Sequence, residues 1–317
     1  LNLVISIEKN DYGSMVILKI NPLIKDYIKS KLTTQTVVEI LHNSMGIIYG
    51  PEWESIKIKL STSVKTTLLY QDFYPGNAHL LTFQYLKYCY QTQHSYTEKI
   101  IKLCIAYCMF LRNEDRFKEL ASFSESVYHL LKVNNSDDTI EILFYYSEGI
   151  RMIGNDLLVI ELLQEVVETD RNLLKVTNST YEELLCTYML SLSMTSDEKA
   201  VSIASRLLEV TPNRSSSYYQ AKTIIVSQSG NKKTKVQKLK KIEKEARKDG
   251  RTLVANNICL QLVNLNENEE DKYLKLVLSS EENTYTRIRA LVSYGRKLFN
   301  TNPDKLMTGG LLTTIVD

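Results

Sequence analysis

From about residue 76 to residue 303, apolar residues recur every three or four positions, and short polar breaks interrupt them about every 17 to 22 residues. This interval is typical of amphipathic helices that bury one face. Glycine-containing breaks at Gly154–Asp156 and Gly250–Thr252 each indicate the end of one helix and the start of the next. Ser/Thr-x-x-Glu sequences predict three further helix starts, which lie at Ser95, Ser179 and Thr195.

The predicted helix starts themselves recur along the chain. Every second start is separated from the next by 31 to 43 residues, in the series Ser95, Ser136, Ser179, Ser215, Thr252 and Asn283. A period in this range is typical of helical-hairpin repeats. Because one hairpin cannot bury its own apolar face, neighbouring hairpins must stack. We therefore expect a mainly α protein in which residues 76–303 form an α-solenoid.

Residues 1–32 have a different pattern. Two runs rich in β-branched residues, 3–7 and 15–20, flank a polar segment of turn-forming residues, which predicts a β-hairpin. Pro22 then suits the first turn of a short amphipathic helix that completes this segment. A hairpin and one short helix are too small to form a domain alone, so we expect them to be the end of a larger module.

Two segments flank the predicted repeats. We expect residues 33–75, whose pattern is mixed, to form a helical connector, and residues 304–317 to begin a further, truncated helix. The sequence begins at Leu1 rather than Met and ends on an apolar run from Leu311. We expect a C-terminal fragment of a longer polypeptide.

Residues 197–213 read DEKAVSIASRLLEVTPN and resemble the second helix and closing turn of a tetratricopeptide repeat. Small Ala200 would let the paired helix approach closely, and Pro212 follows the helix at the spacing that family uses. Leu184 and Tyr188 match positions of the family's first helix, but the glycine expected between the two helices is absent. The resemblance implies a tetratricopeptide-like solenoid whose first helices line a concave face.

Residues 19–28, KINPLIKDYI, follow the predicted hairpin and resemble the end of the winged-helix module in STAND-type NTPases. Such proteins commonly continue into tetratricopeptide-like repeats. The resemblance implies that a nucleotide-binding domain, and an effector with it, precede residue 1. The family's ATPase residues cannot be placed here, because no GxxxxGK[ST] loop occurs in these 317 residues.

Composition narrows the classes of function. With 39 Lys+Arg against 37 Asp+Glu, the net charge of +2 excludes a globally basic nucleic-acid coat, and 11 Gly and 5 Pro argue against an all-β protein. No apolar stretch approaches the length of about 20 residues that a membrane span needs, and we expect no signal peptide, because no charged segment precedes an apolar run. Five cysteines without a CxxC pair favour reduced thiols and a cytoplasmic location.

Motifs for catalysis or metal binding are missing from the sequence. The four histidines lie far apart, and neither HExxH nor GxSxG occurs. Cys104 and Cys108 share one predicted helix face, but two ligands without a partner cluster are not a metal site, and core packing is the favoured interpretation. We expect no enzyme active site, no metal and no cofactor in this fragment.

Between Gly230 and Arg251 stand ten basic and three acidic residues, a local net charge of +7 that leaves −5 for the rest of the chain. One interpretation is a patch for phosphate or for an acidic protein; the favoured alternative is the solvated outer face of a helix whose buried stripe is Val236, Leu239, Ile242 and Ala246. No aromatic residue interrupts the run, so a stacking platform for single strands is not expected. The predicted patch consists of Lys235, Lys238, Lys240, Lys241, Lys244 and Lys248.

Tyrosine is in excess, with 20 Tyr against 7 Phe and 1 Trp. Adjacent tyrosines such as Tyr145 and Tyr146 cannot both face the core, so we expect one of each pair at or near a surface. Half-buried packing between hairpins is the alternative. By the tetratricopeptide resemblance, the candidates for a ligand-binding groove are Tyr145, Tyr146, Arg151, Tyr188, Tyr219, Asn256 and Asn257.

These patterns lead to one functional hypothesis and two alternatives. The first is a protein-recognition (sensor) repeat region of a STAND-type NTPase, which by that resemblance binds a foreign protein such as a phage component, oligomerises through the N-terminal part and activates an effector in antiviral defence. The second is the peptide-sensing repeat domain of a transcriptional regulator. The third is a nucleic-acid-binding helical repeat that uses the basic helix 232–248.

Overall fold

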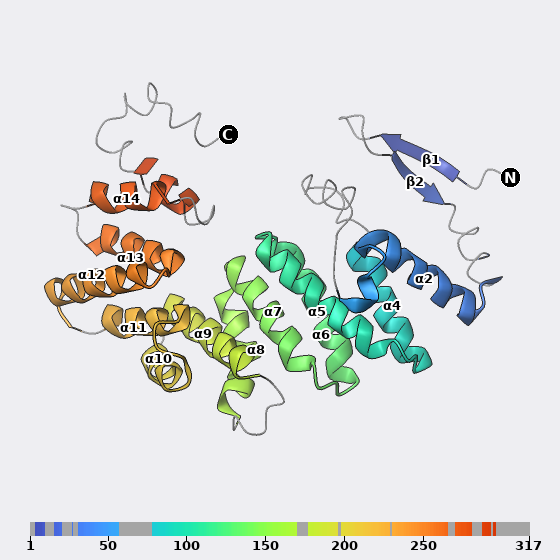
Figure 1. Ribbon diagram of the computed structural model, residues 1–317, viewed down its shortest axis with the longest axis horizontal. Coiled ribbons are helices and arrows are strands. Elements are labelled where there is room, and N and C mark those ends of the chain that lie inside the picture. Colours follow the sequence, from blue (N-terminus) through green and yellow to red (C-terminus); the bar gives the residue numbers. More distant parts are fainter. Residues whose placement is uncertain are drawn as a thin grey trace. The chain divides into compact units, whose positions relative to one another are not determined.

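The computed structural model is mainly α-helical and divides into two compact units, Leu1–Ile142 and Leu143–Asp317 (Figure 1). The residues that the structure describes are 4–9, 16–20, 27, 31–56, 78–169, 177–195, 198–228, 230–265, 270–280, 287–292, 294 and 295. The truncated helix predicted for residues 304–317 lies outside them, as do residues 57–75 of the predicted connector and most of the short helix predicted after Pro22.

The first unit begins with a pair of strands and continues as packed helices. Strand β1 pairs antiparallel with β2, with Val4 opposite Ile20 and Lys9 opposite Val16. Helix α4 packs against α2, α5 and α6, and α5 packs against α6. The elements are β1 (Val4–Lys9), β2 (Val16–Ile20), α2 (Thr34–Tyr49), the 3₁₀ turn η1 (Trp53–Ser55), α4 (Ala78–Thr92), α5 (Thr97–Asn113) and α6 (Phe117–Val133). A strand pair alone does not define a winged-helix module, so that assignment stays a prediction.

The second unit is a series of helices in which each packs against the next from α8 to α14. In addition, α9 packs against α11 and α11 against α13, so consecutive odd-numbered helices from α9 to α13 are also neighbours. This is a helical repeat-like arrangement. The elements are α7 (Thr139–Met152), which spans the boundary between the units, α8 (Asp156–Glu168), α9 (Asn178–Met194), α10 (Lys199–Val210), α11 (Ser216–Gln228), α12 (Lys232–Lys248), α13 (Thr252–Leu265) and α14 (Glu270–Leu278).

We call α7, α9, α11 and α13 the first helices of their hairpins and α8, α10, α12 and α14 the second helices. Ala200 and Ala204 of α10, in the segment that resembles a tetratricopeptide repeat, are fully buried, and α10 packs against both α9 and α11. Close helix contact at these alanines agrees with the role that the sequence predicted for Ala200.

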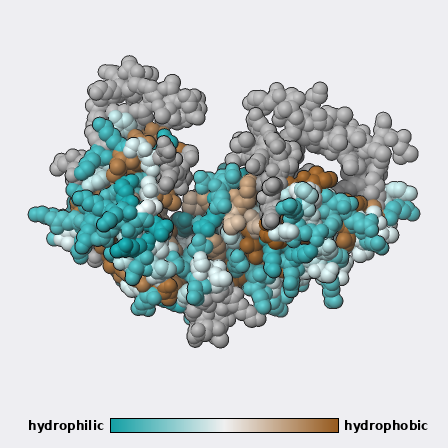
Figure 2. All heavy atoms as spheres, in the orientation of Figure 1, coloured by the Kyte–Doolittle hydropathy of each residue, from teal (hydrophilic) through white to brown (hydrophobic). Residues whose placement is uncertain are grey.

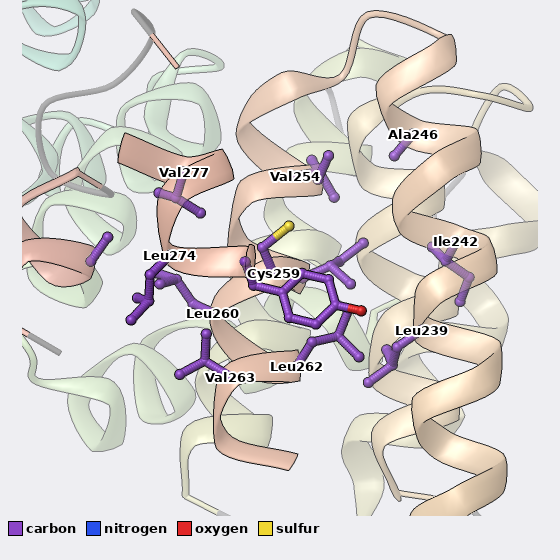
Figure 3. Close-up of a cluster of buried hydrophobic side chains, with 14 of the residues drawn as sticks. Leu239, Ile242, Ala246, Val254, Cys259, Leu260, Leu262, Val263, Leu274 and Val277 are labelled. Carbon is purple, nitrogen blue, oxygen red and sulfur yellow. The ribbon is translucent and has the colours of Figure 1, made fainter. Parts of the chain in front are cut away.

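A cluster of buried apolar side chains holds α12, α13 and α14 together (Figure 3). Leu239, Ile242 and Ala246 project from α12 toward α13, and Leu274 and Val277 project from α14. Helix α13 contributes Val254, Ala255, Ile258, Cys259, Leu260, Leu262 and Val263. Because buried residues occur on several sides of α13, this helix needs neighbours on more than one side.

The glycine-containing breaks form as the sequence predicted. Gly154 and Gly250 have φ values of 89° and 72°, which favour glycine, and they follow the ends of α7 and α12. The Asn155 side chain accepts a hydrogen bond from the Leu158 amide and caps α8.

The predicted capping boxes are wrong at all three positions. Helix α5 follows Tyr96 and not Ser95, because the His94 imidazole accepts from the Tyr96 amide at 3.2 Å and no side chain caps the helix. Helix α9 is capped by Thr177, whose Oγ1 accepts from the Thr180 amide at 3.1 Å, so Ser179 already lies inside it. Thr195 is the C-cap of α9, and its hydroxyl donates to the Leu192 carbonyl at 3.0 Å, whereas α10 begins at Lys199 with Glu198 as its N-cap.

The packing of α13 against its neighbours predicts that substitutions at two of its leucines lower the free energy of unfolding by very different amounts. Leu262→Ala removes a side chain with 0% exposure and is expected to lower the free energy of unfolding by about 2–5 kcal/mol, because the surrounding helices cannot fully close the cavity. The matched control is Leu253→Ala, whose side chain is 40% exposed, with an expected change below about 1 kcal/mol. Urea unfolding followed by circular dichroism measures both. Equal losses for the two variants would contradict the packing described here.

Candidate functional site

The structure buries most of the residues that were predicted to line a groove. Tyr145 and Tyr146 are 7% and 5% exposed, so the expectation that one of them lies at the surface is wrong. The reason is that residues 142–147 of α7 are all buried, and this stretch is therefore covered on every side. Tyr188, Tyr219 and Asn256 are also buried, whereas Arg151 and Asn257 are half-buried.

Two tyrosine hydroxyls of the second unit join helices to their neighbours. The Tyr219 hydroxyl donates to Asp249 Oδ2 at 2.5 Å, and the Arg206 guanidinium donates to the hydroxyl of Tyr181. The pKa of Tyr219 is raised to about 12, mainly because the hydroxyl is removed from water and secondly because it donates a hydrogen bond to Asp249. Each contact joins the two helices of one hairpin, α11 with α12 and α9 with α10, so the alternative interpretation of the tyrosine excess, packing between hairpins, stays a prediction.

Polar side chains of three successive first helices meet across the second unit. The Cys186 thiol of α9 donates to Gln220 Oε1 of α11 at 2.7 Å, and the Ser227 hydroxyl of α11 donates to Gln261 Oε1 of α13 at 3.0 Å. Each pair is separated by 34 residues. We call Cys186, Gln220, Ser227 and Gln261 the polar row. Two neighbouring contacts with the same sequence separation indicate that consecutive hairpins repeat the same geometry.

Two of the predicted groove residues lie beside the polar row. The Arg151 guanidinium of α7 is close enough to Cys186 to oppose the rise that burial causes in the pKa of its thiol. The buried Arg151 Nε has no hydrogen-bond partner among the described residues. Asn257 lies one helical turn before Gln261, on the same face of α13. Arg151 thus lies near the α9 member of the polar row, and Asn257 near its α13 member.

Asn256 takes part in a different set of contacts, a charged network between α12 and α13. Arg247 Nε donates to the buried Glu243 carboxylate at 2.7 Å, and Arg247 Nη2 donates to Asn256 Oδ1 at 3.1 Å. Truncating one member of this network would leave its partner buried without a counter-group. The free-energy cost of that unpaired group is larger than the stabilisation that the intact pair provides. Asn256 is thus placed to orient Arg247 and not to contact a ligand.

The predicted basic patch lies on α12, and its buried stripe forms largely as predicted. Leu239, Ile242 and Ala246 are buried, and Val236 is half-buried against the same cluster. Of the predicted patch, Lys238, Lys241, Lys244 and Lys248 are exposed, while Lys235 and Lys240 are half-buried.

A pocket of about 440 Å³ lies where the end of α12 meets the start of α11. Its walls carry charges of both signs, because Arg214 Nε lies 3.8 Å from Asp249 Oδ2 and Lys222 Nζ lies 3.5 Å from Glu245 Oε2. The lining residues are Asn213, Arg214, Tyr218, Tyr219, Glu245, Lys248 and Asp249. Sequence reasoning missed Asn213 and Arg214; the one available signal was the polar break after Pro212.

The cysteines are unsuited to nucleophilic chemistry. All five are free and buried. Burial raises the pKa of Cys89 to about 11 and the pKa values of Cys186 and Cys259 to about 12, and it also raises the pKa values of Cys104 and Cys108. Among the described residues, no group of three or more His, Cys, Asp or Glu side chains could hold a metal ion.

Comparison with known proteins adds no assignment, because no family model and no curated protein matches the chain. The resemblances to tetratricopeptide repeats and to a winged-helix module therefore depend on the residues alone. In the described part of the chain, no helix combines the length and the apolar character that crossing a membrane requires.

Burial predicts that the native protein resists thiol reagents. At pH 8 we expect no labelling of the five cysteines within minutes, and complete labelling once a denaturant unfolds the chain. The matched control is Ser205→Cys, which places one thiol at an exposed position of α10 and should react at once. Rapid labelling of the unaltered native protein would contradict the burial described.

The raised thiol pKa values also predict a loss of stability in alkali. Folding favours the protonated thiols, and this contribution is complete below the unfolded-state pKa of about 8.5. It decreases as the pH rises toward the folded-state pKa values of about 11 for Cys89 and about 12 for Cys186.

Proposed function

We propose that the second unit recognises a protein or peptide ligand along the polar row. The observation that supports this function is the pair of equivalent contacts, Cys186 with Gln220 and Ser227 with Gln261, on successive first helices. Amide and hydroxyl groups on a half-buried surface offer both donors and acceptors, which an extended peptide backbone requires. Because the row crosses three helices, a ligand would make contacts spread over several hairpins.

The finer form of this proposal is a sensor in a STAND-type NTPase with an α-solenoid of tetratricopeptide-like repeats. It is supported by the sequence resemblances at residues 19–28 and 197–213. Ligand binding would favour an open, oligomerisation-competent state to the extent that the ligand binds that state more tightly. The rival is a peptide-sensing transcriptional regulator, in which the same row would bind a short signal peptide.

The gene that encodes this chain tests the finer proposal. A STAND-type protein requires a GxxxxGK[ST] phosphate-binding loop in the open reading frame upstream of Leu1. Sequencing the parent open reading frame is expected to find that loop within a nucleotide-binding domain. A helix-turn-helix of modest length in its place would support the rival, and an upstream region with neither would overturn both assignments without affecting peptide recognition by the polar row.

A peptide display library tests the recognition surface without knowledge of the natural ligand. Peptides enriched on the protein are expected to lose at least tenfold in affinity for the Gln220→Ala/Gln261→Ala variant, because two amides of the row are removed. The control variant is Gln228→Ala/Gln237→Ala, which changes two exposed glutamines outside the row. Fluorescence anisotropy with the selected peptides measures the affinities. Failure to enrich any peptide, or equal binding to both variants, would overturn the proposal.

A further inference from the structure

Helix α12 separates its charges by sign. Its apolar side chains, Leu239, Ile242 and Ala246, face the core together with the buried carboxylate of Glu243. Lys232, Lys233, Lys238, Lys241, Lys244 and Lys248 are exposed. Figure 2 shows hydrophilic side chains over the part of the molecule that Figure 1 labels α12. The exposed face of this helix is thus cationic, whereas the Glu243 carboxylate is buried and Glu245 is half-buried.

Each acidic residue in and next to α12 already has a cationic or hydrogen-bonding partner. Glu243 accepts from Arg247 at 2.7 Å, and Glu245 lies 3.5 Å from Lys222 and 4.0 Å from Lys241. Asp249 accepts from Tyr219 and faces Arg214. Within the described part of the chain, Lys233, Lys244 and Lys248 have no such partner, so their positive charges are available to a ligand.

Four of the exposed lysines form a line along the helix. They are Lys233, Lys241, Lys244 and Lys248, with successive intervals of eight, three and four residues. These intervals keep the side chains near one face of a helix. We call them the lysine stripe. From Lys233 to Lys248 the helix rises about 22 Å at 1.5 Å per residue. That length corresponds to about six base pairs along the axis of duplex DNA.

The cationic surface continues beyond the end of α12. Lys248, the last residue of the helix, also lines the pocket at the junction with α11. On the other wall of this pocket stands Arg214, whose side chain is 77% exposed. The Arg251 side chain is exposed nearby, and its Nε donates to the Arg214 carbonyl at 3.0 Å. Two arginines thus extend the lysine stripe around the helix end.

We propose that the lysine stripe binds the phosphate backbone of double-stranded nucleic acid without sequence preference. A protein partner fits less well, because interface cores are depleted of lysine and need desolvated apolar or aromatic anchors, none of which belongs to the stripe. Single strands also fit less well, because the exposed face of α12 carries no aromatic side chain on which bases could stack. Lysine suits a hydrated backbone, since it acts as a mobile point charge.

A charge-reversal variant tests this binding mode. The probe is a fluorescent 24-base-pair DNA duplex of mixed sequence, titrated with the protein at about 50 mM salt, where backbone contacts are strong. Lys233→Glu/Lys244→Glu/Lys248→Glu is expected to weaken binding at least tenfold. The logarithm of the unaltered protein's association constant should fall with the logarithm of salt concentration at a slope of about −3 to −4, as expected for about four phosphate contacts.

The control variant has the same net charge as the stripe variant, but its substitutions lie on a different surface. Lys87→Glu/Lys102→Glu/Lys118→Glu changes three exposed lysines of the first unit, and both triple variants have a formal charge of −4 where the unaltered chain has +2. This control should retain binding within about threefold. A glutamine version of the stripe variant, with melting curves for all proteins, separates lost binding from lost folding.

Three outcomes would overturn the proposal. Equal weakening by the stripe and control variants would indicate a general charge effect, and absence of binding to the duplex would exclude it outright. Binding of polyglutamate or of single-stranded oligothymidylate more tightly than the duplex would assign the stripe to an acidic protein or to single strands. None of these outcomes bears on peptide recognition by the polar row, which lies on the first helices.

Discussion

Packing on several sides of the first helices is the constraint on which the second unit depends. Helix α13 buries Val254, Ile258 and Leu262 together with Ala255, Cys259 and Val263, so no single neighbour can cover its apolar surface. It packs against α12, α14 and α11. Helix α9 shows the same property, since most of its residues from Tyr181 to Leu192 are buried. Removing one hairpin would therefore expose apolar surface on the next, which makes stability a property of neighbouring pairs.

Buried polar groups fix how these helices meet. Apolar contacts alone tolerate small rotations of one helix against another, whereas a hydrogen bond requires a narrow range of distance and angle. The contacts of Arg247 with Glu243 and with Asn256 tie α12 to α13 at one register. The hydrogen bond from Tyr219 to Asp249 ties α11 to the end of α12. These contacts hold the polar row and the lysine stripe at defined positions on their helices.

The sequence predicted the helices better than it predicted their exposed faces. Apolar spacing and the breaks at Gly154 and Gly250 located helix ends, because a positive φ and a local hydrogen bond depend on few residues. The buried apolar stripe of α12 was predictable from the spacing of its apolar residues, since only one side of that helix is buried. The faces of α7 were not, because Tyr145 and Tyr146 are both buried by neighbours that a single-helix pattern does not reveal. Asn256 was misplaced for the same reason: its partner, Arg247, lies on another helix.

The two proposed surfaces differ in how they would respond to a rearrangement of the hairpins. The polar row crosses α9, α11 and α13, so a change in the spacing of these helices would separate Cys186 from Gln220 or Ser227 from Gln261. A ligand that spans the row can therefore bind one arrangement more tightly than another, which is the condition for shifting a conformational equilibrium. The lysine stripe lies on one helix, whose internal hydrogen bonds keep its charges at fixed spacing. A polyanion bound there would localise the protein without favouring one arrangement of the hairpins over another. A ligand of the polar row, and not a polyanion on the lysine stripe, would therefore shift the conformational equilibrium.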